Sequence, residues 1–168
     1  MGSRPADLRV EVWGRAPAPA GSFRAILIHG QARLVPGGSN EGLKAAKAWR
    51  KLVTELVRDM AAQVSFDACD GDPVRVRLVF GMPRTKSVPK WRRWPRSAPD
   101  IDKLARCTLD AVTDAGVWNT DGQVVELRCR KEFADPAGAT IEVWKIGDEE
   151  RAASEVARRG ERLPWTDT

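Results

Sequence analysis

The sequence predicts a single α+β domain in which two main helices pack with a mixed or antiparallel sheet. Short runs of alternating apolar and polar residues recur along the chain, and turn residues separate them from two longer stretches with apolar residues at helical spacing. The resulting order is strand, strand, helix, strand, helix, strand, strand. We expect residues 1–147 to form this domain and residues 148–168 to add a peripheral C-terminal helix or tail.

The first two predicted strands lie close to the N-terminus. Leu8, Val10 and Val12 occupy one side of an alternating run, and a second alternating run covers residues 23–29. A proline-rich turn at residues 15–21 separates the two runs. Since the connection is short, the two strands could pair with each other as a wide hairpin.

Two stretches have the apolar spacing of amphipathic helices. Asn40 stands where an N-cap is expected, and apolar residues recur from Leu43 to Met60, which predicts a helix over roughly residues 41–63. The second helix is predicted over residues 101–115, and Gly116 is a natural stop for it.

Three further strands complete the predicted sheet. The first covers residues 74–80, and two more are predicted over residues 123–131 and 140–146, joined by a turn at residues 135–138. Between residue 80 and the second helix, the segment 83–96 contains three prolines. Prolines at this density exclude regular structure, so we expect a mobile loop there.

This loop also concentrates positive charge. The whole chain has 28 Lys and Arg against 23 Asp and Glu, which is an ordinary balance of +5. Within the loop, however, six cations follow one another without an intervening acid: Arg84, Lys86, Lys90, Arg92, Arg93 and Arg96. Such a cluster attracts polyanions through Coulomb forces and counterion release. We interpret the six as DNA-binding residues, and the simpler alternative is a solvated charge run that only aids solubility.

The composition excludes several other classes of protein. Three widely spaced cysteines and a lone histidine, His29, argue against a zinc site, a disulfide framework or a cysteine nucleophile. No stretch approaches the roughly 18 apolar residues that cross a bilayer, and the N-terminus lacks the apolar region of a signal peptide. We therefore expect a cytoplasmic protein that has no membrane partner and no small-molecule cofactor.

Two aspartates, Asp100 and Asp102, flank Ile101 where the second helix begins. Because any helix favours aspartate at its N-cap or in its first turn, capping is the simplest interpretation of both. Two carboxylates this close repel each other, however, unless a cation lies between them. Ligands that offer only oxygen suit Mg²⁺, and Mn²⁺ is possible as well.

A third carboxylate, Asp121, could complete a metal site. The second helix spans about 20 Å, and five extended residues after Gly116 return about 17 Å. If the chain doubles back antiparallel to the helix, Asp121 therefore arrives near Asp102. Arg106, one helical turn beyond Asp102, adds a cation. A carboxylate-bound metal beside a cationic loop is suited to phosphodiester hydrolysis.

The same residues carry a resemblance to a known family. The runs P-D-I-D-K-L-A-R-C-T-L-D-A-V at 99–112, G-V-W at 116–118 and D-G-Q-V at 121–124 resemble the core of the RusA family of Holliday junction resolvases. That core has the pattern P-D-x-D-N-L-x-K-x-x-x-D-A-L, then G-x-W, then D-D-x-Q-V. The upstream order of two strands, a basic helix and a third strand agrees with the family more loosely.

The resemblance implies a RusA-like fold and a crossover junction endodeoxyribonuclease of DNA recombination and repair. Such an enzyme is a homodimer that cuts branched DNA with Mg²⁺, and its metal-binding catalytic carboxylates would be Asp100, Asp102 and Asp121. Three polar positions depart from the family pattern, since Lys103 replaces an asparagine, Arg106 replaces the functional lysine and Thr120 replaces the first acid of D-D-x-Q-V. Arg106 keeps the charge but stays protonated, so only Lys103 could take over a proton shuttle.

The resemblance also gives the loop tryptophans a possible role. Trp91 and Trp94 are available to stack on bases opened at a junction.

Two other functions stay open on sequence alone. The domain could be a non-catalytic DNA-binding module that lost its chemistry through Lys103 and Arg106. It could also be a plain α+β interaction protein whose aspartates only cap helices. A binding module would show no Mg²⁺-dependent nicking, and an interaction protein would show no steep salt dependence toward DNA.

Overall fold

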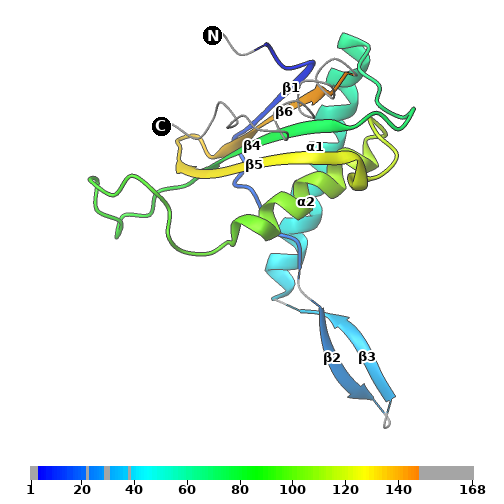
Figure 1. The fold of residues 1–168 in the computed structure, drawn as a ribbon. Coiled ribbons are helices and arrows are strands. Elements are labelled where there is room, and N and C mark those ends of the chain that lie inside the picture. The colour runs from blue at the N-terminus through cyan, green and yellow to red at the C-terminus, as the bar shows by residue number, and fades with distance from the viewer. Residues whose placement is uncertain (1–3, 22, 29–30, 38, 148–168) are drawn as a thin grey trace, which may run out of the picture.

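The computed structural model describes residues 4–21, 23–28, 31–37 and 39–147 (Figure 1). Its elements, in chain order, are β1 (Leu8–Trp13), β2 (Phe23–Ile28), β3 (Gln31–Pro36), α1 (Asn40–Val64), β4 (Val74–Met82), α2 (Ile101–Asp114), the 3-10 helix η1 (Asp121–Gln123), β5 (Val124–Phe133) and β6 (Gly138–Lys145). The α+β class is confirmed. His29 and the predicted C-terminal helix or tail at 148–168 lie outside the described residues.

Four of the strands form a mixed sheet in the order β1-β6-β4-β5. β6 runs antiparallel to both of its neighbours, whereas β4 and β5 are parallel to each other. A parallel pair requires a crossover connection, and here the basic loop and α2 provide it. Among the described residues, no helix is both long enough and apolar enough to cross a membrane.

The expected pairing of the first two strands is wrong. β1 pairs with β6 along its whole length, because Leu8, Val10 and Val12 are buried against the core. β2 pairs instead with β3, a strand that the alternation in the sequence does not reveal. Ile28 lies opposite Gln31, which leaves a two-residue connection, the commonest length in hairpins. This hairpin projects from the body of the domain (Figure 1).

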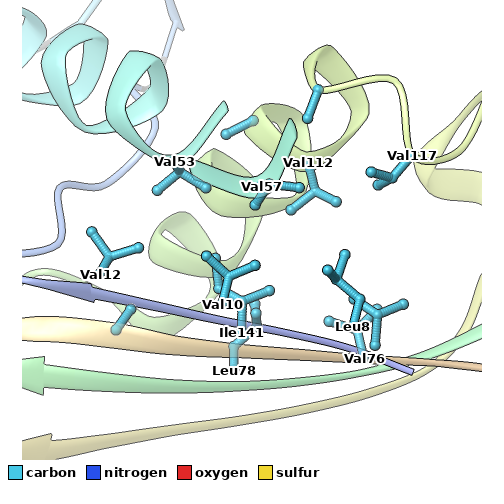
Figure 2. Close-up of a cluster of buried hydrophobic side chains, with 14 of the residues drawn as sticks. Leu8, Val10, Val12, Val53, Val57, Val76, Leu78, Val112, Val117 and Ile141 are labelled. Atoms are coloured by element: carbon cyan, nitrogen blue, oxygen red, sulfur yellow. The ribbon is translucent and has the colours of Figure 1, made fainter. Parts of the chain in front are cut away.

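Both long helices cover the same face of the sheet, and the core lies between the two layers (Figures 1 and 2). Val10 of β1, Leu78 of β4 and Ile141 of β6 lie on the helix side of the sheet, where Val53 of α1 and Val112 of α2 pack. All five are buried. The period of two in the strands and of 3.6 in the helices is what aligns these residues on facing surfaces.

Polar contacts set how α1 and α2 pack together. The indole N–H of the buried Trp49 donates to Thr108 Oγ1 at 3.3 Å. At the C-terminal end of α2, the Asp114 carboxylate accepts from the Arg50 guanidinium of α1, from Nε at 2.5 Å and Nη2 at 2.9 Å. The N-cap of α1 is Ser39, not Asn40 as predicted.

We expect Thr108→Val to lower the free energy of unfolding by about 1–3 kcal/mol, because the substitution leaves the buried Trp49 N–H without its acceptor. Urea denaturation followed by tryptophan fluorescence measures this loss. Thr140→Val is the matched control, since the half-buried Thr140 hydroxyl has no hydrogen bond within the described residues. Equal losses in the two variants would contradict the expectation.

Candidate functional site

The first candidate carboxylate, Asp100, occupies the N-cap position of α2 but does not act as a cap. Its backbone is extended, as an N-cap requires, yet its side chain makes no capping hydrogen bond. The carboxylate instead accepts a hydrogen bond from Lys103 Nζ at 3.0 Å. About 61% of the side chain is exposed. The capping interpretation therefore does not account for Asp100, whose oxygens face solvent.

Asp102 and Arg106 extend the polar surface along the first two turns of α2. Both side chains are exposed, and within the described residues neither has a hydrogen-bond or ion-pair partner. Their spacing of four residues places the carboxylate and the guanidinium on one face of the helix. The positive end of the helix dipole favours anions at this terminus. Both groups are thus free to bind something outside the chain.

Lys103 directly follows Asp102 in sequence, and its charge interacts with both aspartates. Its hydrogen bond to Asp100, together with the negative charge of Asp100 and of Asp102, raises the pKa of the Lys103 ammonium, although desolvation opposes this shift. A lysine with a raised pKa stays protonated at neutral pH. In this arrangement Lys103 supplies a positive charge and is poorly suited to accept a proton.

Asp121 does not return to Asp102 within the chain. It opens η1, which follows the C-terminal end of α2, whereas Asp102 lies at the N-terminal end (Figure 1). The intervening residues are held where the helix ends: Trp118 Nε1 donates to Thr113 Oγ1 at 2.7 Å. Gln123 Nε2 then donates to the carbonyls of Ala68 at 2.7 Å and Asp72 at 2.9 Å. These contacts hold the segment after α2 at the C-terminal end of the helix, so it does not carry Asp121 back along α2.

The residue that does reach the start of α2 is Lys131 of β5. Its Nζ donates to the carbonyl oxygens of Ser97 at 3.1 Å and Pro99 at 2.9 Å. The eight strand residues from Val124 to Lys131 span about 23 Å, which is close to the length of α2. Lys131 fixes the segment immediately before Asp100. Sequence reasoning missed it because one lysine in an alternating strand carries no distinctive signal.

The donor chemistry at the start of α2 fits a hard divalent cation. Asp100 and Asp102 offer only carboxylate oxygens, and Mg²⁺ is commonly held by one or two carboxylates together with water and substrate phosphate. Within the described residues, no three acidic, histidine or cysteine side chains are grouped closely enough to hold a metal ion. One chain therefore presents two of the three expected ligands at this end of the helix.

The basic loop follows β4 and leads directly into α2. It contains no helix or strand, as predicted, but it is held by its own side chains. Arg84 donates to the carbonyls of Pro89 and Arg92, both at 2.9 Å, and its guanidinium lies 4.0 Å from the ring centre of Phe133 on β5. Of the six predicted DNA-binding cations, only Arg92 is half-buried and the other five are exposed. All six lie on the loop that ends at Asp100.

An apolar hollow of about 620 Å³ lies beside the first carboxylate. The proline-rich segment forms one wall with Pro17 and Pro19, and Asp100 and Lys103 form another. The backbone of this segment is joined to α2, because Ala20 N–H donates to the Lys103 carbonyl at 2.9 Å. Phe133 completes the far side of the hollow.

The cysteines offer no second reactive centre in the described part of the chain. Burial, with a smaller contribution from Asp110, raises the pKa of the Cys107 thiol to about 11. Burial also raises the pKa of Cys129, and a hydrogen bond to Asp67 is the main cause of the raised pKa of Cys69. Since the thiolate is the nucleophile, all three are inert at neutral pH.

Comparison with known proteins gives a consistent result. Residues 40–144 match the family model described as Endodeoxyribonuclease RusA. The crossover junction endodeoxyribonuclease RusA of Shigella sonnei is 27% identical over 104 residues, which cover 61% of this chain and 74% of that protein. Proteins with the same name from Escherichia coli K12 and Enterobacteria phage 82 are each 26% identical over the same length and shares. The matched span includes α1, the basic loop, α2 and β5.

We expect Lys131→Met to loosen the segment that precedes α2, because the carbonyls of Ser97 and Pro99 lose their shared donor. Hydrogen–deuterium exchange should then be faster for the amides of residues 96–104. Lys51→Met, at an exposed site on α1, is the control and should leave that segment unchanged. Unchanged exchange in the Lys131 variant would show that the two hydrogen bonds do not hold the segment.

Proposed function

Because the chain belongs to the RusA endodeoxyribonuclease family, we propose that it is a Mg²⁺-dependent endonuclease that resolves four-way DNA junctions by phosphodiester hydrolysis. The observation that carries this proposal is the state of Asp100 and Asp102. They stand at a helix N-terminus, exposed to solvent and not used as caps, at the end of a loop with six cations. The curated relatives named above are crossover junction endodeoxyribonucleases, which supports the choice of substrate.

We assign the metal to Asp100, Asp102 and Asp121. When bound, Mg²⁺ would lower the pKa of a coordinated water and offset negative charge on the phosphate. The Lys103 ammonium forms an ion pair with the Asp100 carboxylate, so a positive charge already lies where a metal ion would bind. Arg106 lies one helical turn beyond Asp102 on the same face of α2. Its guanidinium can donate to a phosphate oxygen as negative charge develops on that oxygen. The six loop cations would grip the flanking backbone.

The third carboxylate would come from a second copy of the chain. Asp121 and the pair Asp100–Asp102 lie at opposite ends of α2, and all three are exposed. In a twofold dimer, a contact from one copy to the other is repeated in reverse. Two copies that face each other with α2 reversed would therefore complete two identical sites at once. Two equivalent sites are what symmetric cutting of a four-armed junction needs.

We expect Asp102→Asn to abolish Mg²⁺-dependent cleavage of a synthetic four-way junction while junction binding stays within about twofold, because the amide keeps the shape but not the charge of the ligand. Gel analysis of labelled junctions measures cleavage, and a mobility shift without metal measures binding. If the unsubstituted protein binds junctions but never nicks them with Mg²⁺ or Mn²⁺, it is a non-catalytic binding module.

Mixing two inactive variants tests the shared site. Asp102→Asn and Asp121→Asn should each be inactive alone, and their mixture should regain nicking. In a mixed dimer with shared sites, one site receives both substituted residues and the other receives neither. If both carboxylates served the same chain, every site would keep one substitution and the mixture would stay inactive. That second result would remove the dimeric site and leave the junction endonuclease to be judged by the preceding test.

Arg106 should act through its charge. We expect Arg106→Ala to lower the single-turnover cleavage rate about 100-fold, a loss typical of removing one donor to a developing oxyanion. Arg106→Lys should retain most of the rate, and junction affinity should change little in either variant. Arg58→Ala, near the other end of α2, is the control for loss of a surface arginine. Equal rates for the alanine and lysine variants would exclude a role for the charge.

A further inference from the structure

A second hollow, of about 510 Å³, lies between the basic loop and the end of β5. This volume falls within the roughly 300–1,000 Å³ that is typical of ligand sites. It is lined from the loop by Arg84, Lys90, Trp91, Arg93 and Trp94, and from the strand by Arg130, Glu132 and Phe133. The hollow is separate from the carboxylates, but Phe133 also lines the apolar hollow beside Asp100. The Phe133 ring thus borders both hollows.

The loop side of the hollow is held in shape by Arg84. Two hydrogen bonds from its guanidinium join residues 89 and 92 of the loop, and the same group stacks over Phe133. Arg130 is held on the strand side by an ion pair with Glu132 at 3.0 Å. Because both sides are fixed within the fold, the hollow does not depend on a ligand for its existence.

The two tryptophans present large exposed rings inside this hollow. Trp91 is 75% exposed and Trp94 is 43% exposed, although an indole normally gains by burial. The guanidinium of Arg93 lies 5.2 Å from the ring centre of Trp94, and that of Arg92 lies 5.9 Å from Trp91. Rings beside cations in an open groove are the combination with which proteins hold single-stranded nucleic acid.

The cations at the rim are available for phosphates. Within the described residues, Lys90 and Arg93 have no carboxylate within ion-pair distance. On the face of the sheet opposite the helices the arrangement is different: Arg9 and Arg77 both bind the buried Glu142, at 2.6 Å and 2.5 Å. Lys90 and Arg93 therefore keep positive charge that no carboxylate compensates within the described residues, unlike Arg9 and Arg77.

Resting on the proposed function, we propose that this hollow binds one unpaired nucleotide of branched DNA, with its base stacked on Trp91 or Trp94 and its phosphate against Lys90 and Arg93. In an intact duplex both faces of every base are covered by neighbours, so only a base that has left the stack can meet an indole face. The site would thus distinguish a branch point, where bases are open, from continuous duplex. Through Phe133 and Lys131, it is connected to the segment that carries the catalytic carboxylates.

The test measures binding alone, in the cleavage-inactive Asp102→Asn background and without metal. Two probes share one sequence: a fully paired duplex, and the same duplex with a single unpaired thymine. At one fixed salt concentration, fluorescence anisotropy should show tighter binding to the bulged duplex. Trp91→Ala and Trp94→Ala should each weaken binding to the bulged duplex about tenfold, and should change binding to the paired duplex less than twofold.

Two further variants serve as controls. Trp91→Phe keeps an aromatic face and should retain the preference for the bulged duplex. Trp13→Ala removes a tryptophan of similar exposure to Trp94 from β1, which does not line this hollow, and should have no effect. Equal losses on both duplexes, no preference before substitution, or an equal loss in Trp13→Ala would overturn the proposal. Failure of the proposed function would appear instead in the junction cleavage assay, which this measurement does not use.

Discussion

The parallel pairing of β4 with β5 is the constraint on which the rest of the structure depends. Parallel neighbours require the chain to return along the sheet before the second strand begins, and α2 makes that return. A helix of 14 residues spans about 21 Å, so its two ends lie at opposite ends of the strands. The acidic residues at those ends, Asp102 and Asp121, are therefore kept apart by the topology of the sheet. The proposed three-carboxylate metal site would therefore need Asp121 from a second chain.

The same pairing brings the other end of β5 to the start of α2. Lys131 lies near the end of a strand that must run parallel to β4, and so it meets the chain where α2 begins. Its two hydrogen bonds join the edge strand, the basic loop and the segment before Asp100. Arg84 repeats this connection a few residues away through Phe133. The loop that carries the positive charge is thereby attached at both of its ends to the edge of the sheet.

Most elements could be predicted from sequence because their signals are local. The periodicity of apolar residues predicts both helices and five of the strands within a few residues, since each element shows its buried face in its own pattern. The partner of β1 could not be predicted, because pairing with β6 depends on residues about 130 positions away. From sequence, the position of Asp121 could be predicted only from the length of the chain after α2. That length does not reveal the hydrogen bonds of Trp118 and Gln123, which hold the segment at the C-terminal end of α2.

The distribution of charge explains why DNA would approach the loop and not the face of the sheet that lies opposite the helices. That face is rich in arginine, but its arginines are balanced by carboxylates: Glu142 serves Arg9 and Arg77, and Glu126 serves Arg75. If a phosphate drew Arg9 and Arg77 away from Glu142, this buried carboxylate would be left without a compensating positive charge. The loop cations carry no such penalty within the described residues. A net charge of +5 is modest, and its effect on a polyanion comes from its concentration in the loop, where the cations have no carboxylate partners among the described residues. Within the described chain, this loop leads to the only helix start that has two exposed carboxylates.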